Sequence, residues 1–178
     1  MPRKSDNSVS SPPIPPIPDA PDDDLAENEV KLEVPGYRQM DDHSCGPVAA
    51  WSILQTFHPG STSYHAFYAD CEADEDGANE IQIIRALRMN RIGVGLRDEM
   101  TFKDLIKTID RGFPILSSIR QRGWEDHWVC IYGYGLKPSR VFTCNHAQNG
   151  SHGRKEYRWS EWRRRWDPSS QYLICWGT

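Results

Sequence analysis

The pattern of hydrophobic and polar positions divides the chain into three parts. Residues 1–33 show no periodic spacing of apolar residues. From Val34 the apolar residues first recur with the spacing of amphipathic helices, and after Gly112 they alternate with the period of two that is typical of β-strands. Helices followed by strands predict an α+β domain over residues 34–178, in which an N-terminal helical part packs on an antiparallel sheet.

The helical part contains predicted helices over residues 47–57, 61–73, 79–89 and 101–111. The first begins with a proline, which suits the first turn of a helix because the missing N–H would have no partner there. The fourth opens with Thr101 and Asp104, which resemble a capping box. One face of the third is predicted to be apolar and to contain Ile81, Ile83, Ile84 and Leu87.

Strands are expected over residues 114–120, 127–134, 140–144 and 172–176, with a short helix over 160–166 between the last two. Arginines and tryptophans interleave in that helix, and we expect the tryptophans to pack on the sheet and the arginines to face water. This interpretation is favoured over a nucleic-acid interface. Alternation in the second strand places His127, Val129 and Ile131 on one face and Trp128, Cys130 and Tyr132 on the other.

Residues 1–33 contain seven of the thirteen prolines and an acidic run at Asp22–Asp24. Proline fixes φ and lacks a backbone donor, so this segment is predicted to be an extended, disordered, acidic tail without a packed core. Residues 1–35 carry eight acidic against three basic side chains, so the net charge of −4 for the whole chain arises there. The folded part is close to neutral, and neither a nucleic-acid nor a membrane partner is expected.

Five cysteines are present, an odd number without paired spacing. At least one thiol must then be unpaired, which suits a reduced protein with one working thiol better than a disulfide scaffold. The N-terminus has no apolar stretch that could serve as a secretory signal peptide. We therefore expect synthesis in the cytoplasm, and a specialised secretion system if the chain acts elsewhere.

Cys45 is the strongest candidate for chemistry. It precedes Gly46 and Pro47 at the start of a predicted helix, where unpaired N–H groups and the helix dipole favour a thiolate. We expect its pKa to lie below the usual thiol range. Gln39, six residues earlier, can supply an amide donor to an oxyanion, with the Cys45 N–H as the second donor.

His127 is the expected general base, because it begins a strand that can face the helix carrying Cys45. His43 is the rival base, but it is too near Cys45 in sequence to face it easily across a cleft. Asn145 ends the next predicted strand, and its side-chain amide is expected to accept the imidazole N–H and so orient the ring.

A substrate groove is predicted around these residues. Gly46 removes a side chain that would block a substrate backbone. Trp51, Trp124 and Trp128 are the aromatic residues available to narrow the cleft. Narrow walls predict small residues, above all glycine, immediately before the scissile bond. No cofactor is expected, and the Cys-x-His pairs at residues 43–45 and 144–146 lack the partners of a metal site.

These motifs resemble those of the C39-type, papain-like cysteine peptidases. The resemblance covers residues 34–178 and rests on Gln39, Cys45-Gly46-Pro47 and His127-Trp128-Val129 in that order. It implies a papain-like fold with a catalytic triad of Cys45, His127 and Asn145 and an oxyanion-stabilising Gln39. The family commonly has Asp followed by Pro at the third position, where this chain has Asn145 followed by His146.

The resemblance also implies substrates and partners. Some similar peptidases cut after a double glycine in leader peptides and are fused to transporters, whereas free-standing domains act as toxins or effectors, with which an immunity or inhibitor protein would pair. This sequence contains no transporter segments. The expected activity is therefore cleavage of a protein or peptide substrate. An acyltransferase or glutamine deamidase of the same fold is one alternative, and a non-catalytic binding module with a decayed triad is another.

Overall fold

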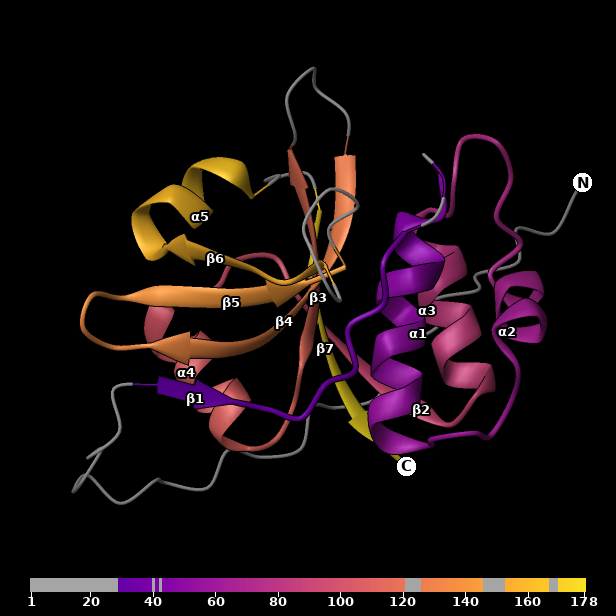
Figure 1. The fold of residues 1–178 in the computed structure, drawn as a ribbon, viewed down its shortest axis with the longest axis horizontal. Helices are drawn as coiled ribbons and strands as arrows, with labels where there is room; N and C mark the ends of the chain where they lie inside the picture. Colours follow the sequence, from indigo (N-terminus) through magenta and orange to yellow (C-terminus); the bar gives the residue numbers. More distant parts are fainter. Residues whose placement is uncertain (1–28, 40, 42, 121–125, 146–152, 167–169) are drawn as a thin grey trace, which may run out of the picture.

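The computed structural model describes residues 29–39, 41, 43–120, 126–145, 153–166 and 170–178. Within these residues the chain forms one seven-stranded sheet and five α-helices (Figure 1). This is the α+β architecture, with helices and an antiparallel sheet, that the sequence pattern predicts. No helix among the described residues is long and apolar enough to cross a membrane.

The sheet is antiparallel throughout, in the order β2-β7-β3-β4-β5-β6, with β1 added beside β4. The strands are β1 (Glu29–Lys31), β2 (Ile92–Arg97), β3 (Ile115–Arg120), β4 (Asp126–Gly135), β5 (Arg140–Cys144), β6 (Lys155–Arg158) and β7 (Tyr172–Gly177). The central strand β4 pairs with β3 along its first half and with β1 along its last three residues.

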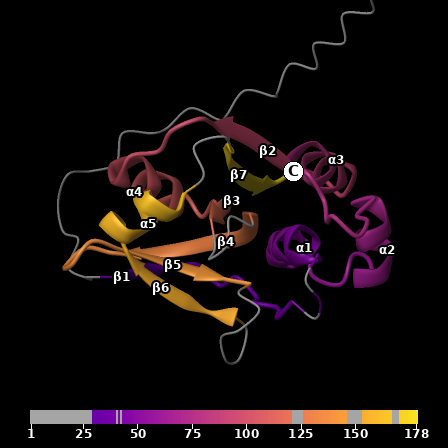
Figure 2. The same cartoon turned by 90° about the horizontal axis from the view of Figure 1, so that it is seen from above.

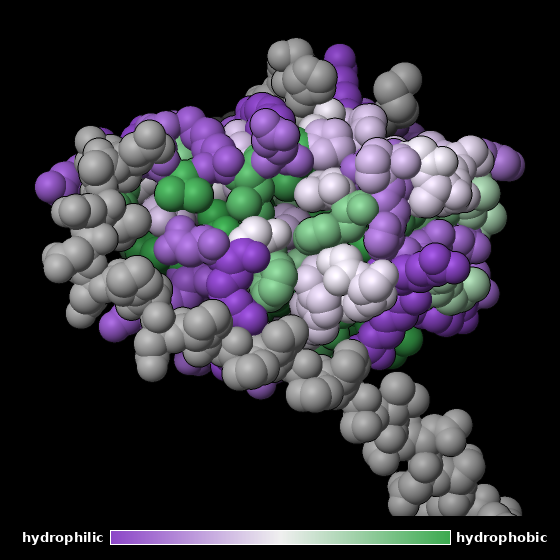
Figure 3. Space-filling view, turned by 90° about the horizontal axis from the view of Figure 1, so that it is seen from below, coloured by the Kyte–Doolittle hydropathy of each residue, from purple (hydrophilic) through white to green (hydrophobic). Residues whose placement is uncertain are grey.

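The helices divide between the two faces of the sheet, as Figures 1 and 2 show. They are α1 (Cys45–Phe57), α2 (Tyr64–Asp70), α3 (Glu80–Met89), α4 (Phe102–Asp110) and α5 (Trp159–Arg165). Helices α1, α2 and α3 lie together on one side, and α4 and α5 lie on the other. Seen from below, the surface mixes hydrophobic and hydrophilic residues, with the most hydrophobic ones gathered on the side of the sheet (Figure 3).

Two hydrophobic cores follow from this arrangement, and β4 contributes to both. Trp128, Cys130 and Tyr132 belong to the core under α1 and α3. Val129 and Ile131 belong to the core under α4 and α5. The predicted alternation of these residues is therefore confirmed, because a strand in the middle of such a sheet buries both of its faces.

Local sequence accounts for where the helices begin. Thr101 caps α4 through a capping box with Asp104, as predicted. Asn79 and Gln82 form a second capping box at α3. The predicted apolar face of α3 is wrong at one position, since Ile81 is 77% exposed while Ile83 and Leu87 are fully buried. At 100° per residue, Ile81 points away from the side of the helix that contains Ile83.

The helix α5 has the predicted amphipathic character. Trp162 is fully buried and its indole N–H donates to the Tyr172 hydroxyl at 3.3 Å. Arg163 and Arg164 are exposed. The strand β6 precedes this helix directly and was not predicted, nor was β2, whose sequence Ile92-Gly-Val-Gly-Leu-Arg97 contains two glycines that are uncommon in strands.

The strand β1 lies inside the segment predicted as tail, so the boundary at residue 33 is too late. Glu29 forms an ion pair with Arg140, and the Lys31 ammonium lies 4.2 Å from the centre of the Phe142 ring. Gly133 allows the pairing, because a Cβ there would clash with the Val30 carbonyl oxygen. The ordered part of the chain therefore includes residues 29–33, and the prediction for residues 1–28 lies outside the described residues.

Two truncations are expected to differ in stability. Removing residues 1–28 should leave the melting temperature unchanged, because a proline-rich acidic segment has little apolar surface to bury. Removing residues 1–33 should lower it by several degrees, since β1 and the Arg140 ion pair are lost with them. Thermal unfolding followed by circular dichroism measures both. Equal melting temperatures for the two truncated proteins would show that β1 contributes nothing to stability.

Candidate active site

The helix α1 begins at Cys45 itself, two residues earlier than the sequence pattern predicts. Asp41 fixes the backbone just before this helix, because its Oδ1 accepts hydrogen bonds from the backbone N–H groups of Ser44 at 2.6 Å and His43 at 3.0 Å. The Ser44 side chain makes no capping hydrogen bond. Cys45 is thus the first helical residue, with the unpaired N–H groups of the first turn around it.

The Cys45 sulfur lies against β4. The backbone N–H groups of Trp128, Gly46 and Cys45 point at it. Trp128 directly follows His127 in β4, so the predicted nucleophile and the predicted base are brought to the same end of α1 and β4 (Figure 1). Cys45 and His127 therefore lie in neighbouring segments, at the start of α1 and the start of β4.

The protonation states of the two residues are set mainly by burial. Burial raises the pKa of the Cys45 thiol above its ordinary value, although the three N–H groups lower it in part. Burial likewise lowers the pKa of His127 to about 4, against a smaller opposite effect of a hydrogen bond with the Asn145 backbone. The expectation of a thiolate in the resting protein is therefore wrong. In the resting protein at neutral pH the imidazole is therefore neutral and the thiol is protonated.

The alkylation of Cys45 by iodoacetamide is expected to report this state. Cys45 is half-buried, whereas Cys71, Cys130, Cys144 and Cys175 are fully buried, so Cys45 should be labelled first. Its rate should keep rising through the alkaline range, because a raised pKa means that the thiolate forms only above the ordinary thiol range. Timed labelling followed by peptide mass spectrometry measures the rate at each pH. A rate that is already maximal at neutral pH would instead indicate a preformed thiolate–imidazolium pair.

Asn145 occupies the end of β5 but uses its side chain differently from the prediction. Its Nδ2 donates to the Ser52 Oγ at 2.8 Å and to the Tyr37 carbonyl at 3.1 Å. Its backbone, not its amide, forms the hydrogen bond with the His127 ring that acts on the ring's pKa. A bond that favours the protonated imidazole requires an acceptor, so the backbone carbonyl is the partner.

Gln39 is 6% exposed and lies on the extended segment before α1. The Tyr37 carbonyl, two residues earlier, is held by Asn145. This contact ties the segment that carries Gln39 to the end of β5, beside His127. His43, the rival base, places its Nε2 3.8 Å from the Asp41 carboxylate.

The predicted groove residues separate into different environments. Gly46 packs in the core, because a Cβ there would lie 3.0 Å from the Ile83 side chain and 3.3 Å from the Trp128 side chain. Gly46 therefore allows α1 to approach α3 and β4 rather than admitting a substrate. Trp128 is buried and packs in the core under α1 and α3. Trp124 lies outside the described residues.

Trp51 does line a cavity, of about 470 Å³, on the outer side of α1. Its ring contacts Tyr64 edge-on, with the ring centres 5.7 Å apart. Tyr64 and Tyr68 are not among the predicted groove residues, although their four-residue spacing on a predicted helix is a usable signal. The cavity is lined by Tyr37, Arg38, Asp41, Ser44, Val48, Trp51, Tyr64, His65 and Tyr68. Among these lining residues, Ser44 directly precedes Cys45 in the chain.

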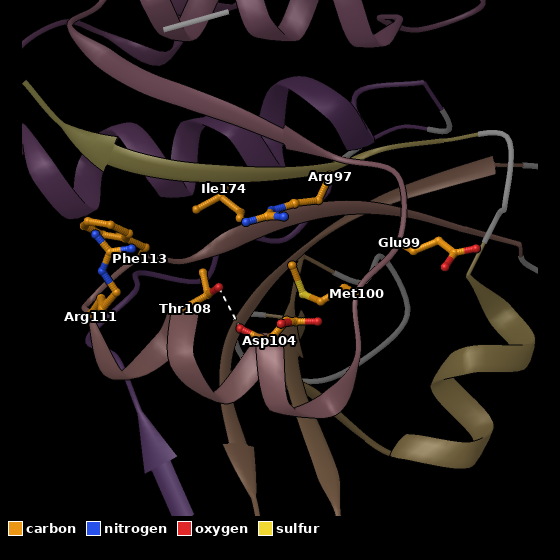
Figure 4. A pocket seen from close by; sticks show the side chains of 8 residues that line it. All are labelled: Arg97, Glu99, Met100, Asp104, Thr108, Arg111, Phe113 and Ile174. Atoms are coloured by element: carbon orange, nitrogen blue, oxygen red, sulfur yellow. Dashed lines mark hydrogen bonds between the residues drawn. The ribbon is translucent and has the colours of Figure 1, made fainter. Parts of the chain in front are cut away.

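Other cavities lie away from these residues. One of about 30 Å³, the size of a single water, separates α4 from β2 and β7 (Figure 4). Arg97 and Ile174 enter it from the strands, and Asp104 and Thr108 come from α4. Another, of about 260 Å³, lies between α4 and α5. No cluster of three or more metal-ligating side chains occurs in the described part of the chain.

The fold matches solved structures of peptidases at low sequence identity. The chain aligns with a double glycine motif protease from an AMS/PCAT transporter, in complex with the leader peptide, with a TM-score of 0.65 and 20% identity over 83% of this chain and 94% of that one. It aligns with the peptidase domain of Streptococcus ComA, a bi-functional ABC transporter involved in a quorum sensing pathway, with a TM-score of 0.62 and 14% identity over 83% and 98%.

A third structure, described as a C39-like peptidase from Bacillus anthracis, aligns with a TM-score of 0.63 and 11% identity over 85% of this chain and 99% of that one. No curated protein matches the sequence. The fold and its family together define a protein of the cysteine peptidase kind. The chain belongs to the Peptidase C39-like family, which matches it over residues 31–174.

Proposed function

We propose that the chain cleaves peptide bonds with Cys45 as nucleophile and His127 as general base. The observation that carries this proposal is the position of the partly buried thiol at the first residue of α1, with its sulfur against the backbone of Trp128, which follows His127. A neutral His127 accepts the thiol proton as the sulfur attacks the peptide carbonyl. It then delivers that proton to the leaving amine, which breaks the carbon–nitrogen bond and leaves a thioester on Cys45.

Water completes the reaction. His127 removes a proton from the water as it attacks the thioester carbonyl, and the Cys45 sulfur leaves as the thiol after regaining that proton. In both attacks negative charge develops on the carbonyl oxygen. Gln39 and the Cys45 N–H are the donors that we propose for this oxyanion. Asn145 completes the site by holding His127.

The substrate is proposed to be a peptide or protein segment with small residues before the scissile bond. Support comes from the similar double glycine motif protease, whose structure contains a leader peptide. The tryptophans give less support than the sequence suggested, because Trp128 packs in the core. The aromatic cavity beside Ser44 fits an apolar side chain of the substrate at a position beyond the small residues.

Incubation of the purified chain with a mixed peptide library, followed by product sequencing, tests the activity. Cleavage after glycine or alanine supports the proposal, and preference for a bulky or charged residue before the bond contradicts its specificity. The mass of each product separates the alternatives, since cleavage gives two fragments, deamidation changes one mass slightly, and acyl transfer gives a conjugate.

A role as an exported toxin or effector, acting on a protein substrate and matched by an inhibitor protein, is a further part of the proposal.

A further inference from the structure

Asn145 has an unusual backbone conformation at the point where β5 ends. Its φ is 76°, in the left-handed region, and the residue is fully buried. Asparagine enters this region more readily than most residues with a side chain. The conformation redirects the chain beside His127 after the last pair of β4 and β5, which joins Cys130 to Cys144.

The hydrogen bonds fix which way the Asn145 amide points. The Tyr37 carbonyl can only accept, so the group 3.1 Å from it must be the NH₂ of Asn145. The same NH₂ donates to the Ser52 Oγ at 2.8 Å, and the Oδ1 faces the Cys144 sulfur at 3.1 Å. Reversing the amide would place oxygen against oxygen at Tyr37, which is unfavourable in a buried site.

The Ser52 hydroxyl is placed to accept a hydrogen bond from the Asn145 side-chain amide. It lies seven residues after Cys45, two turns along α1, and is fully buried. Its hydroxyl donates to the Val48 carbonyl at 3.3 Å, which leaves an oxygen lone pair for the Asn145 NH₂. One hydroxyl thereby connects the helix that carries the thiol to the residue that holds the imidazole.

We propose that Ser52 and Asn145 form a positioning pair for His127. The Asn145 side chain fixes the end of β5 to α1 and to the Tyr37 carbonyl, and the Asn145 backbone carbonyl then holds the ring in the tautomer that leaves the other nitrogen to the thiol. This inference rests on the proposed function. It assigns the amide of Asn145 a task that differs from direct acceptance of the imidazole N–H.

An aspartate at position 145 distinguishes positioning through the side-chain amide from direct acceptance of the imidazole N–H. An aspartate at position 145 could accept an imidazole N–H at least as well as asparagine, and the family commonly has aspartate there. It could not donate to the Tyr37 carbonyl, and its charge would lie buried against that oxygen. In this chain, therefore, asparagine and aspartate are not interchangeable.

The test uses Asn145→Asp and Ser52→Ala in the full chain, with Ser117→Ala as the matched control. Ser117 is an equally buried serine on β3, and its hydroxyl donates to the neighbouring Ser118 carbonyl at 3.4 Å. Two readouts are combined: kcat and KM on a peptide that the wild type cleaves, and the ¹⁵N shifts of the His127 ring, assigned with His127→Gln. The ring shifts report the tautomer and need no substrate.

Asn145→Asp is expected to lower kcat by about tenfold or more, and Ser52→Ala by about three- to tenfold. Losses of this size correspond to one or two buried hydrogen bonds, and KM should change little. Both should mix the ring tautomers, and Ser117→Ala should change neither. The double variant Ser52→Ala/Asn145→Ala should be no slower than Asn145→Ala, because the two residues act through one bond.

Wild-type kcat and an unchanged ring spectrum in Asn145→Asp would overturn the positioning role. If Asn145→Asp fails to fold, Ser52→Ala decides by the same criteria. If the wild type cleaves no peptide, the proposed function fails, and the ring spectra of Ser52→Ala and Ser117→Ala still decide the positioning role. An altered spectrum in Ser52→Ala alone supports it, and the same spectrum in both contradicts it.

Discussion

Replacing Cys45 with alanine is expected to abolish peptide-bond cleavage while leaving the fold intact. The acyl-enzyme cannot form without the sulfur, and loss of a nucleophile that works as a unit with its base lowers kcat by about 10⁴-fold or more. The fold should tolerate the change because Cys45 is only half-buried and alanine is a good helix former at the start of α1. Cleavage assays and thermal unfolding on the same preparation measure both effects.

Cys175→Ala is the matched control, and the opposite result is expected for it. Cys175 is fully buried in β7 and belongs to the core under α1. Truncating it should lower the melting temperature through lost packing while the remaining folded protein keeps its specific activity. Cleavage at the wild-type rate by Cys45→Ala would refute the nucleophile assignment and show that another group attacks the peptide bond.

Much of the fold could be predicted because local rules and burial agree along most of the chain. The capping box at Thr101 and the alternation in β4 are examples in which a short sequence pattern corresponds directly to a contact. β1 could not be found this way. It is three residues long, and its pairing with β4 depends on Gly133, more than a hundred positions away. The missing side chain of Gly133 lets the backbone of β1 approach β4.

The candidate site shows the same division between local and distant causes. The sequence places Cys45 at a helix start, and the structure agrees. It could not reveal that burial outweighs the helix N–H groups, so the predicted direction of the Cys45 pKa was wrong. Nor could it reveal that Gly46 serves the packing of α1, since this depends on where Ile83 and Trp128 come to lie.

Asn145 contacts the His127 ring through its backbone, and its role as third triad member stays a prediction. Its distance in sequence from His127 suggests a third triad member, and the structure does bring it to the ring. The contact is made by the backbone because the side chain is already bonded to Ser52 and Tyr37. Only the fold brings α1, the segment before it and β5 together at one amide, so no local pattern could have indicated the bond.

Gln39→Ala is expected to lower kcat by about 10²- to 10³-fold, the usual effect of removing one oxyanion donor, with a small change in KM. The donor acts on charge that exists only in the transition state, which is why kcat carries the effect. Gln39 is suited to this task because it is buried, and its segment is tied to Asn145 through the Tyr37 carbonyl. Steady-state kinetics on a single cleaved peptide measures the split between kcat and KM.

Gln39→Glu sharpens the prediction, because a carboxylate keeps the shape but donates no hydrogen bond and repels the oxyanion. It should be at least as slow as Gln39→Ala. Gln82→Ala is the control: it removes a glutamine of the α3 capping box, so stability should fall by about 1 kcal/mol while kcat stays at the wild-type level. If Gln39→Ala retains full kcat, the oxyanion is held by other donors, and Gln39 serves only to pack the segment before α1.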